Sequence, residues 1–385
     1  MTDPVVVGLT EDEKILKETV RRFAEQEIAP RAREMDAKDV FPREVMSGLG
    51  KLGLLGITVP EEYGGAGAGI RAQAIVVEEL ARVSAAVTSS YAAHSNLVLD
   101  NLNRHAGPSI KEKYFPALCT GEAIGCLAIT EPGAGSDAIS MRCTARRDGD
   151  AYILNGTKIF ITNGPVADVI VVYAKTEPKL GSKGISTFVV EKDFPGFSVG
   201  RKIAKMGHRG SPFGELIFQD CRVPAENLVG EENSMVRMVL QGLHRERIIW
   251  SSEAVGIAQG AYAIARKYVV EREQFGRVLA DFQMVQEKLV DMALDINLGR
   301  LLVRRCAVMA DMGMNAEVAL EASYAKLFTG EMAERVTSKG LHMLGGYGYT
   351  QEFQIERYFR DAKAMPIGAG TSEIQRLIIA RKLLE

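Results

Sequence analysis

A glycine-rich turn near the C-terminus, "MPIGAGTSEIQRL" (Met365 to Leu377), is one place where this sequence could hold a reacting molecule against the backbone. Glycines flank Ala369, and a threonine and a serine precede an apolar-periodic run that predicts a helix. Glycine lets a backbone approach a ligand closely, so the turn is suited to a cofactor or a substrate. Ala369 carries no reactive group, and the chemistry of such a site therefore needs a side chain from elsewhere.

Two segments in the middle of the chain carry groups that suit a flat cofactor. In "AITEPGAGSDAIS" (128–140), hydroxyls and the amides of a glycine-rich loop could bind a flavin edge or a phosphate, although a tight domain-crossing turn explains the loop equally well. In "KIFITNG" (158–164), Phe160 and Thr162 share one strand face, where a ring and a hydroxyl could cover and bind a cofactor. Ordinary strand patterning is the simpler interpretation of the second segment.

Two later segments could contact a diphosphate or come close to a ligand. The segment "VEREQFGRVLADFQ" provides a cation in Arg272, an apolar ring in Phe275 and an amide in Gln283, which could bind a diphosphate. A solvated helix end is the commoner reason for such residues. Glycines interrupt the helical pattern of "LHMLGGYGYTQEFQIERYFRDAK" (341–363), which is usually only a turn.

The run "GGAGAG" at 64–69 lacks the preceding strand of a dinucleotide fingerprint, and we interpret it as a loop.

Three regions with different hydrophobic periods must position these groups. Residues 1–124 have mainly helical spacing, and residues 125–232 alternate with period two and are rich in β-branched side chains. Residues 233–385 return to long amphipathic helices, roughly at 233–270, 281–312, 314–343 and 371–384. The order predicts an α+β protein with an N-terminal helical domain, a middle antiparallel sheet or small barrel, and a C-terminal four-helix bundle.

Composition excludes several classes of function. The formal net charge of −2 over 385 residues lacks the basic excess typical of nucleic-acid binding. No apolar run approaches the ~18 residues of a membrane span. The five cysteines are scattered without CxxC spacing, so neither a disulfide framework nor a metal site is indicated. The acidic start predicts a cytoplasmic protein, or a mitochondrial matrix protein only if a transit peptide has been removed.

Together these segments resemble the acyl-CoA dehydrogenase family over nearly the whole chain. "AITEPGAGSDAIS" and "GGYGYTQEFQIERYFRD" are similar to the two signatures of that family, and "SYAAHSNLVL", "ITNGPVADV" and "IGAGTSE" resemble its isovaleryl-CoA branch. The resemblance implies one FAD per subunit of a homotetramer. It also implies contacts to FAD from Leu127, Ile129, Thr130, Ser136, Phe160, Thr162, Arg272, Phe275, Gln283, His342, Gly346, Thr371 and Glu373. His342 stands where the family usually has glutamine.

The resemblance also implies a mechanism and a base. In the family, a carboxylate removes the α proton of an acyl-CoA thioester while the β hydrogen leaves as hydride to flavin N5. Most relatives carry the base at the position of Ala369; a smaller group carries it on the first helix of the C-terminal domain, where Glu246 matches. Glu246 lies between Arg245 and Arg247, a charge run that by itself indicates a solvated helix face. Because the reaction requires a base, we expect Glu246 to fill that role, with the Ala369 amide and a flavin ribityl hydroxyl bonding the thioester oxygen.

The remaining expectations concern the substrate. We expect Ser136, His244, Arg247 and Gly368 to contact it, with Gly368 opening the acyl pocket where relatives often carry tyrosine, or else merely permitting a tight turn. A short- or medium-chain, branched acyl-CoA follows, within fatty acid or branched-chain amino acid catabolism, with electron-transfer flavoprotein as the acceptor. The alternatives are a cyclic (cyclohexane-carboxylyl) or long-chain acyl-CoA, or another flavin reaction on the same fold.

Overall fold

The computed structural model describes residues 8–385, leaving aside the side chains of residues 235–242. Its N-terminal part is helical, as the period predicts. The first helix begins at a capping box, in which Thr10 accepts from the Glu13 amide and the Glu13 side chain accepts from the Thr10 amide. The helices are α1 (Glu11–Phe23), α2 (Ala29–Lys38), α3 (Arg43–Lys51), α4 (Ile70–Ala81), α5 (Ala85–His94), α6 (Asn101–His105) and α7 (Pro108–Thr120).

The middle part is one sheet with the order β1-β4-β2-β3-β7-β6, and β5 pairs with β4. Its strands are β1 (Gly125–Ala128), β2 (Thr144–Asp148), β3 (Ala151–Thr162), β4 (Val169–Lys175), β5 (Ile185–Glu191), β6 (Phe197–Lys202) and β7 (Phe213–Pro224). The predicted antiparallel pairing holds for four pairs, but β4 runs parallel to both β1 and β2. Sequence alternation does not distinguish these pairings, because it reports which face a residue takes and not which strand lies beside it.

The C-terminal part contains the four predicted long helices and one more. They are α8 (Met235–Glu271), α9 (Gln283–Asp311), α10 (Asn315–Met343) and α12 (Ser372–Leu384), and the short α11 (Ile355–Ala362) is additional. A two-stranded ribbon of β8 (Glu273–Gln274) and β9 (Arg277–Val278) joins α8 to α9. No described helix is both long enough and apolar enough to cross a membrane.

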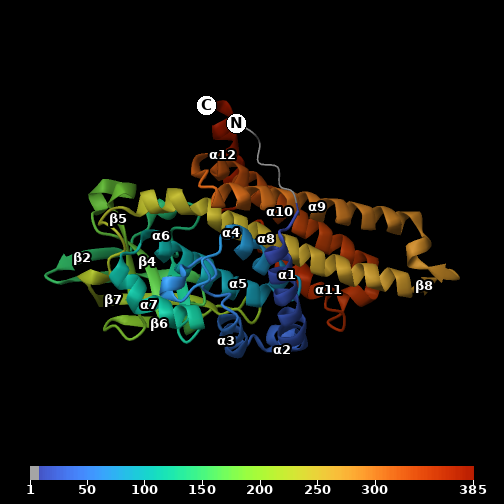
Figure 1. Ribbon diagram of the computed structural model, residues 1–385, viewed down its shortest axis with the longest axis horizontal. Coiled ribbons are helices and arrows are strands. Elements are labelled where there is room, and N and C mark those ends of the chain that lie inside the picture. The colour runs from blue at the N-terminus through green and yellow to red at the C-terminus, as the bar shows by residue number, and fades with distance from the viewer. Residues whose placement is uncertain (1–7) are drawn as a thin grey trace.

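The sheet and the helix bundle meet along α8. Figure 1 shows the strands gathered at one end of the molecule, with α8 running from there to the opposite end, where β8 lies, and with α9 and α10 beside it. The largest apolar core joins α4, α5, α8, α9 and α10, and a second core lies within the sheet. Along α8, Arg247 contacts Ser323 of α10, and Trp250 contacts Met365 in the turn that precedes α12.

Candidate active site

Three consecutive charged residues on α8 turn in different directions. Arg245 pairs with Asp100 at 3.0 Å, and the Arg247 guanidinium donates to Ser323 Oγ at 3.1 Å on α10. The Asp100 carboxylate and the Ser323 hydroxyl are both buried, and Arg247 is buried as well. The charge run is therefore not a solvated helix face, the interpretation that the local sequence alone favours.

Glu246 lies between these two arginines and close to the sheet. Burial raises the pKa of the Glu246 carboxyl. The nearby Arg247 and Lys326 cations act to lower that pKa, but burial has the larger effect. Its charge also acts on Tyr173 of β4. The side chain keeps some accessible area despite this desolvation. The carboxyl is therefore desolvated although the residue is not fully buried.

Lys326 links Glu246 to the glycine-rich turn. This lysine of α10 is fully buried, and its Nζ donates to the Pro366 carbonyl at 3.1 Å. Burial, and after it the Arg247 cation, lower its pKa to about 8, although the Glu373 and Glu246 carboxylates act in the opposite direction. One buried ammonium therefore contacts the turn and acts electrostatically on the carboxyl of Glu246.

The turn itself has the backbone expected of a close ligand approach. Ala369 has φ of 52° and Gly370 has φ of 86°, so a residue with a Cβ occupies the left-handed region at Ala369. Gln375 donates to the carbonyls of both residues, at 3.2 and 3.1 Å. Within the described chain the Ala369 amide has no acceptor. The strained amide is thus free to donate to a bound molecule.

Gly368 differs from the expectation that it leaves room for a branched chain. A Cβ at this position would lie 2.4 Å from Cζ2 of Trp250, so the indole already fills the space that a larger residue would take. The indole N–H donates to the Met365 carbonyl at 2.9 Å, which fixes the ring against the turn. The glycine is required by the packing of Trp250.

His244 is buried next to the same charged residues. Neither ring nitrogen has a hydrogen-bond partner among the described residues. Burial, with the Arg245 and Arg104 cations, lowers its pKa to about 4, so the ring is neutral at neutral pH. Buried polar groups are usually hydrogen-bonded, so this imidazole is able to form hydrogen bonds with a substrate.

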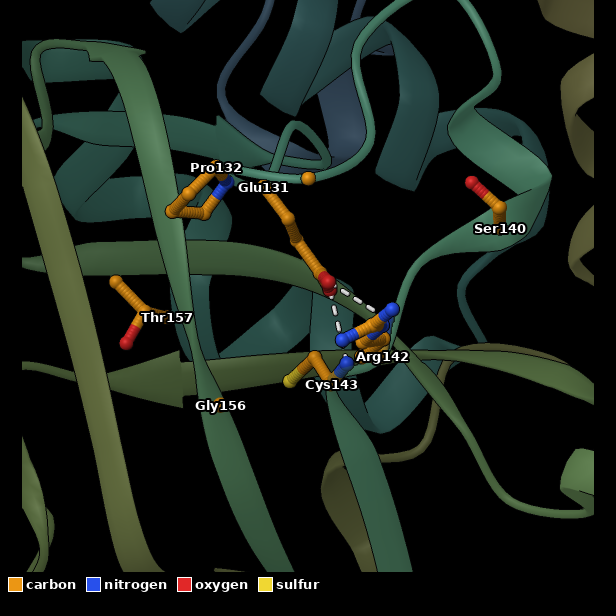
Figure 2. Close-up of a pocket in the computed structure, with 8 residues that line it drawn as sticks. Glu131, Pro132, Ser140, Arg142, Cys143, Gly156 and Thr157 are labelled. Carbon is orange, nitrogen blue, oxygen red and sulfur yellow. Dashed lines mark hydrogen bonds between the residues drawn. The ribbon is translucent and has the colours of Figure 1, made fainter.

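The loop 128–140 is tied down by a buried ion pair at its base. The Lys158 ammonium donates to Glu131 Oε1 at 2.8 Å and to the Ile129 carbonyl at 3.0 Å. Figure 2 shows Glu131 accepting the amides of Arg142 and Cys143, at 2.6 and 2.9 Å, from the far side of the loop. Burial acts to raise the pKa of Glu131, but Lys158 and the two amides outweigh it and hold that pKa below its usual range. The pair holds the loop against β3, and Glu131 also lines a hollow of about 320 Å³.

The residues around this loop fit one edge of a flavin. Phe160 is half-exposed at 53%, sits at a bulge with φ of 62°, and lies nearly parallel to Phe213 at 5.7 Å. Ile159 and Ile161 are buried on the opposite side, as the alternation predicts. The following residues on or beside the loop keep some accessible area: Leu127, Ile129, Thr130, Ser136 and Thr162. In the described chain the three hydroxyls of this group have no hydrogen-bond partner, so a ligand with matching polar atoms would satisfy them.

The residues expected at the diphosphate and adenine lie at the other end of the bundle. Arg272, His342 and Gly346 line one hollow of about 460 Å³, and the Arg272 guanidinium lies 5.7 Å from the centre of the Tyr347 ring. Phe275, beside β8, is 93% exposed, and Gln283 is exposed at the start of α9. Figure 1 shows β8 at the end of the molecule opposite the sheet. One chain therefore does not bring these residues to the flavin-edge group.

Thr371 and Glu373 mark the start of α12, near the turn. The Thr371 hydroxyl accepts the Ile374 amide at 3.3 Å and caps the helix, and Glu373 is exposed in the first turn. The capping role explains threonine here without a ligand. Neither role excludes the other, because the helix N-terminus also favours an anion.

Several residues of the site were missed by sequence reasoning. Lys326 and Lys158 are both fully buried. Lys158 follows Tyr152 and Leu154 on the buried alternating positions of β3, and that break in an apolar pattern was a usable signal. Lys326 lies between the buried Ser323 and Thr329 on its helix and gave no such signal. Trp250 is the single tryptophan of the chain and stands four residues after Glu246, hence on the same helix face. A buried group of Ser89, His208 and Glu253 beneath the indole had no sequence signal, because its members come from three distant segments.

Comparison with known proteins gives matches over the whole described chain. Family profiles described as acyl-CoA dehydrogenase N-terminal, middle and C-terminal domains match residues 10–122, 126–221 and 236–384. The mitochondrial isovaleryl-CoA dehydrogenase of Oryza sativa subsp. japonica is 44% identical over 371 residues, which are 96% of this chain and 90% of that protein.

Solved structures agree with these matches. Butyryl-CoA dehydrogenase from Megasphaera elsdenii superposes with a TM-score of 0.95 at 36% identity, covering 99% of this chain and 100% of that one. A structure described as the electron transferring flavoprotein of Acidaminococcus fermentans gives a TM-score of 0.95 at 39% identity, covering 99% and 100%.

Proposed function

Because this chain belongs to the acyl-CoA dehydrogenase family, and is thus an FAD-containing oxidoreductase that acts on CH–CH groups, we propose that Glu246 is its catalytic base. The substrate class proposed is a short- or medium-chain, branched acyl-CoA, which becomes the trans-2-enoyl-CoA. The observation that carries the proposal is the position of Glu246: a desolvated carboxyl joined through Lys326 to a turn with a free amide.

The arrangement matches what α-proton removal requires. The α proton of a thioester is weakly acidic, so the base needs a pKa raised toward the operating pH, and burial raises that of Glu246. Negative charge develops on the thioester oxygen as the proton leaves, and the Ala369 amide is placed to donate to it. FAD, when bound along Thr130, Ser136 and Thr162, would supply the acceptor for the β hydrogen, which leaves as hydride. The neutral His244 and the buried Arg247 are proposed to hold the thioester end of the substrate.

The separation of the two cofactor-contact groups supports a shared site. Thr130, Ser136 and Thr162 would hold the flavin end, while Arg272 and Gln283 would hold the diphosphate and adenine of FAD bound to a neighbouring copy. We therefore propose a homotetramer in which each FAD contacts two chains, with Phe275 reaching the neighbour. Electron-transfer flavoprotein is the proposed acceptor, and a structural match described by that name supports it.

The substrate class is supported by the names of the matched proteins, which act on isovaleryl-CoA and butyryl-CoA. A panel of straight, branched and cyclic acyl-CoA thioesters, with an artificial electron acceptor, tests it. A preference for isovaleryl-CoA or a near relative supports the proposal. A preference for cyclohexane-carboxylyl-CoA or a long-chain thioester replaces it with the corresponding alternative.

The base is tested by rapid mixing under anaerobic conditions. Glu246→Gln should retain FAD absorbance and bind thioester, yet bleaching of the flavin should slow by roughly 10²- to 10⁴-fold, the usual contribution of a general base. Glu246→Asp should keep part of the rate. Glu317→Gln, the same change at an exposed carboxylate on α10, is the control and should bleach normally. Normal bleaching by Glu246→Gln would overturn the assignment.

A further inference from the structure

Trp250 lies one helical turn from Glu246 and packs against the turn that contains Ala369. It follows Glu246 by four residues on α8, so the two side chains share a helix face and lie about 6 Å apart along the axis. The edge of its six-membered ring abuts Gly368, next to the free amide of Ala369. A chain whose α carbon lies at Glu246 and whose carbonyl lies at Ala369 therefore starts within one helical turn of the indole.

The indole is held in place on three sides. Its N–H donates to the Met365 carbonyl at 2.9 Å, and its edge leaves no room for a Cβ at Gly368. Its face lies 6.4 Å from the His208 ring at 19° between planes. His208 is fixed in turn, because its ring nitrogens lie 2.7 Å from Ser89 Oγ and 3.0 Å from the Asp361 carbonyl. Moving the indole would break a partly buried hydrogen bond and leave its neighbours unpacked.

We infer that Trp250 is the wall that limits acyl-chain length, and that Gly368 is glycine so that this wall fits. The inference rests on the proposed position of the α carbon at Glu246. It selects among the proposed substrates, because a fixed indole one turn away admits a short chain with a small branch and excludes a long one. Specificity thus lies in a tryptophan of α8 rather than in an open space beside Gly368.

The test measures binding as well as turnover. In Trp250→Leu, kcat/KM for octanoyl-CoA should rise by at least ~10-fold relative to that for butyryl-CoA, since one excluded methylene is worth 10- to 200-fold. Dissociation constants for the same pair should shift in the same direction when Trp250→Leu is placed in the inactive Glu246→Gln background. Tyr262→Leu, which removes a half-buried aromatic about 18 Å further along α8, is the control and should leave the preference unchanged.

The glycine gives a second, independent test. Gly368 has no left-handed backbone requirement, so Gly368→Ala should harm the enzyme only through the 2.4 Å contact with the indole. The loss should be large alone and small when combined with Trp250→Leu. If the chain-length preference in binding stays unchanged in Trp250→Leu, Trp250 does not limit chain length. That conclusion holds even where Glu246→Gln abolishes turnover. If the preference shifts while Glu246→Gln still turns over, Trp250 still limits chain length, and only the assignment of Glu246 as the base is refuted.

Discussion

Replacement of Lys158 by methionine should loosen the loop that carries the flavin-edge residues. The Lys158 ammonium is fully buried and lies 2.8 Å from Glu131, which is 7% exposed. At an effective dielectric constant of 20, two unit charges at 2.8 Å attract by about 6 kcal/mol. Desolvation offsets most of that attraction in the intact pair, but the loss of one partner leaves a buried charge and typically costs about 3–5 kcal/mol.

The expected result is a local opening of the loop. A cost of this size increases the equilibrium for opening by roughly a hundred- to a few-thousand-fold. Hydrogen exchange followed by mass spectrometry should detect it in peptides that contain Arg142 and Cys143, whose amides donate to Glu131. FAD should also dissociate more readily, because Thr130 lies on the same loop.

Two further variants make the experiment decisive. Glu131→Gln combined with Lys158→Met leaves no unpaired buried charge and should restore part of the protection, because the single amide oxygen of glutamine still accepts from one of the two backbone amides. Lys192→Met, the same substitution in an exposed pair with Asp168, should change little, because exposed pairs contribute little. Unchanged protection in Lys158→Met, or a double variant as open as the single one, would refute the reasoning.

Three other outcomes follow from the described contacts. Lys326→Met removes a cation that lowers the pKa of Glu246, so the acid limb of the profile of kcat/KM against pH should move to higher pH. An acid limb at the same pH would show that Lys326 does not act on the catalytic base. Burial raises the pKa of Glu253 to about 8, from 4.5, so the folded chain holds an extra proton between these values and loses stability as pH rises through them. Thermal midpoints of Glu253→Gln should therefore fall less than those of the parent between pH 5 and 9, and parallel curves would contradict this. Phe275→Asp alters a side chain that is 93% exposed, so sedimentation should show smaller assemblies with less bound FAD at unchanged helicity; an intact, fully loaded tetramer would remove Phe275 from the interface.

Much of the fold could be predicted from hydrophobic period. The helix expected at 281–312 is α9 at Gln283–Asp311, and the one at 314–343 is α10 at Asn315–Met343. Strand neighbours were harder, because β1 pairs with β4 some forty residues later in the chain. Alternation identifies the buried face of each strand but carries no information on its partner.

The site was predictable only in part, for a physical reason. The positions of Glu246 and Ala369 came from a resemblance, whereas the burial of Glu246 depends on α10 and β4, which no local pattern reveals. Gly368 shows the limit most clearly. Its small size suggested an open pocket, but the volume is occupied by Trp250 from a helix more than one hundred residues earlier. A residue's own size says little about free space until its neighbours are known.

The central claim is that Glu246 takes the α proton, and proton exchange tests it apart from hydride transfer. The holoenzyme is incubated in D₂O with an acyl-CoA analogue that has no transferable β hydrogen, and mass spectrometry follows deuterium at the α carbon. The account predicts exchange by the parent enzyme and by Glu317→Gln, and none above the uncatalysed rate by Glu246→Gln. Exchange by Glu246→Gln at the parent rate would show that another group removes the proton.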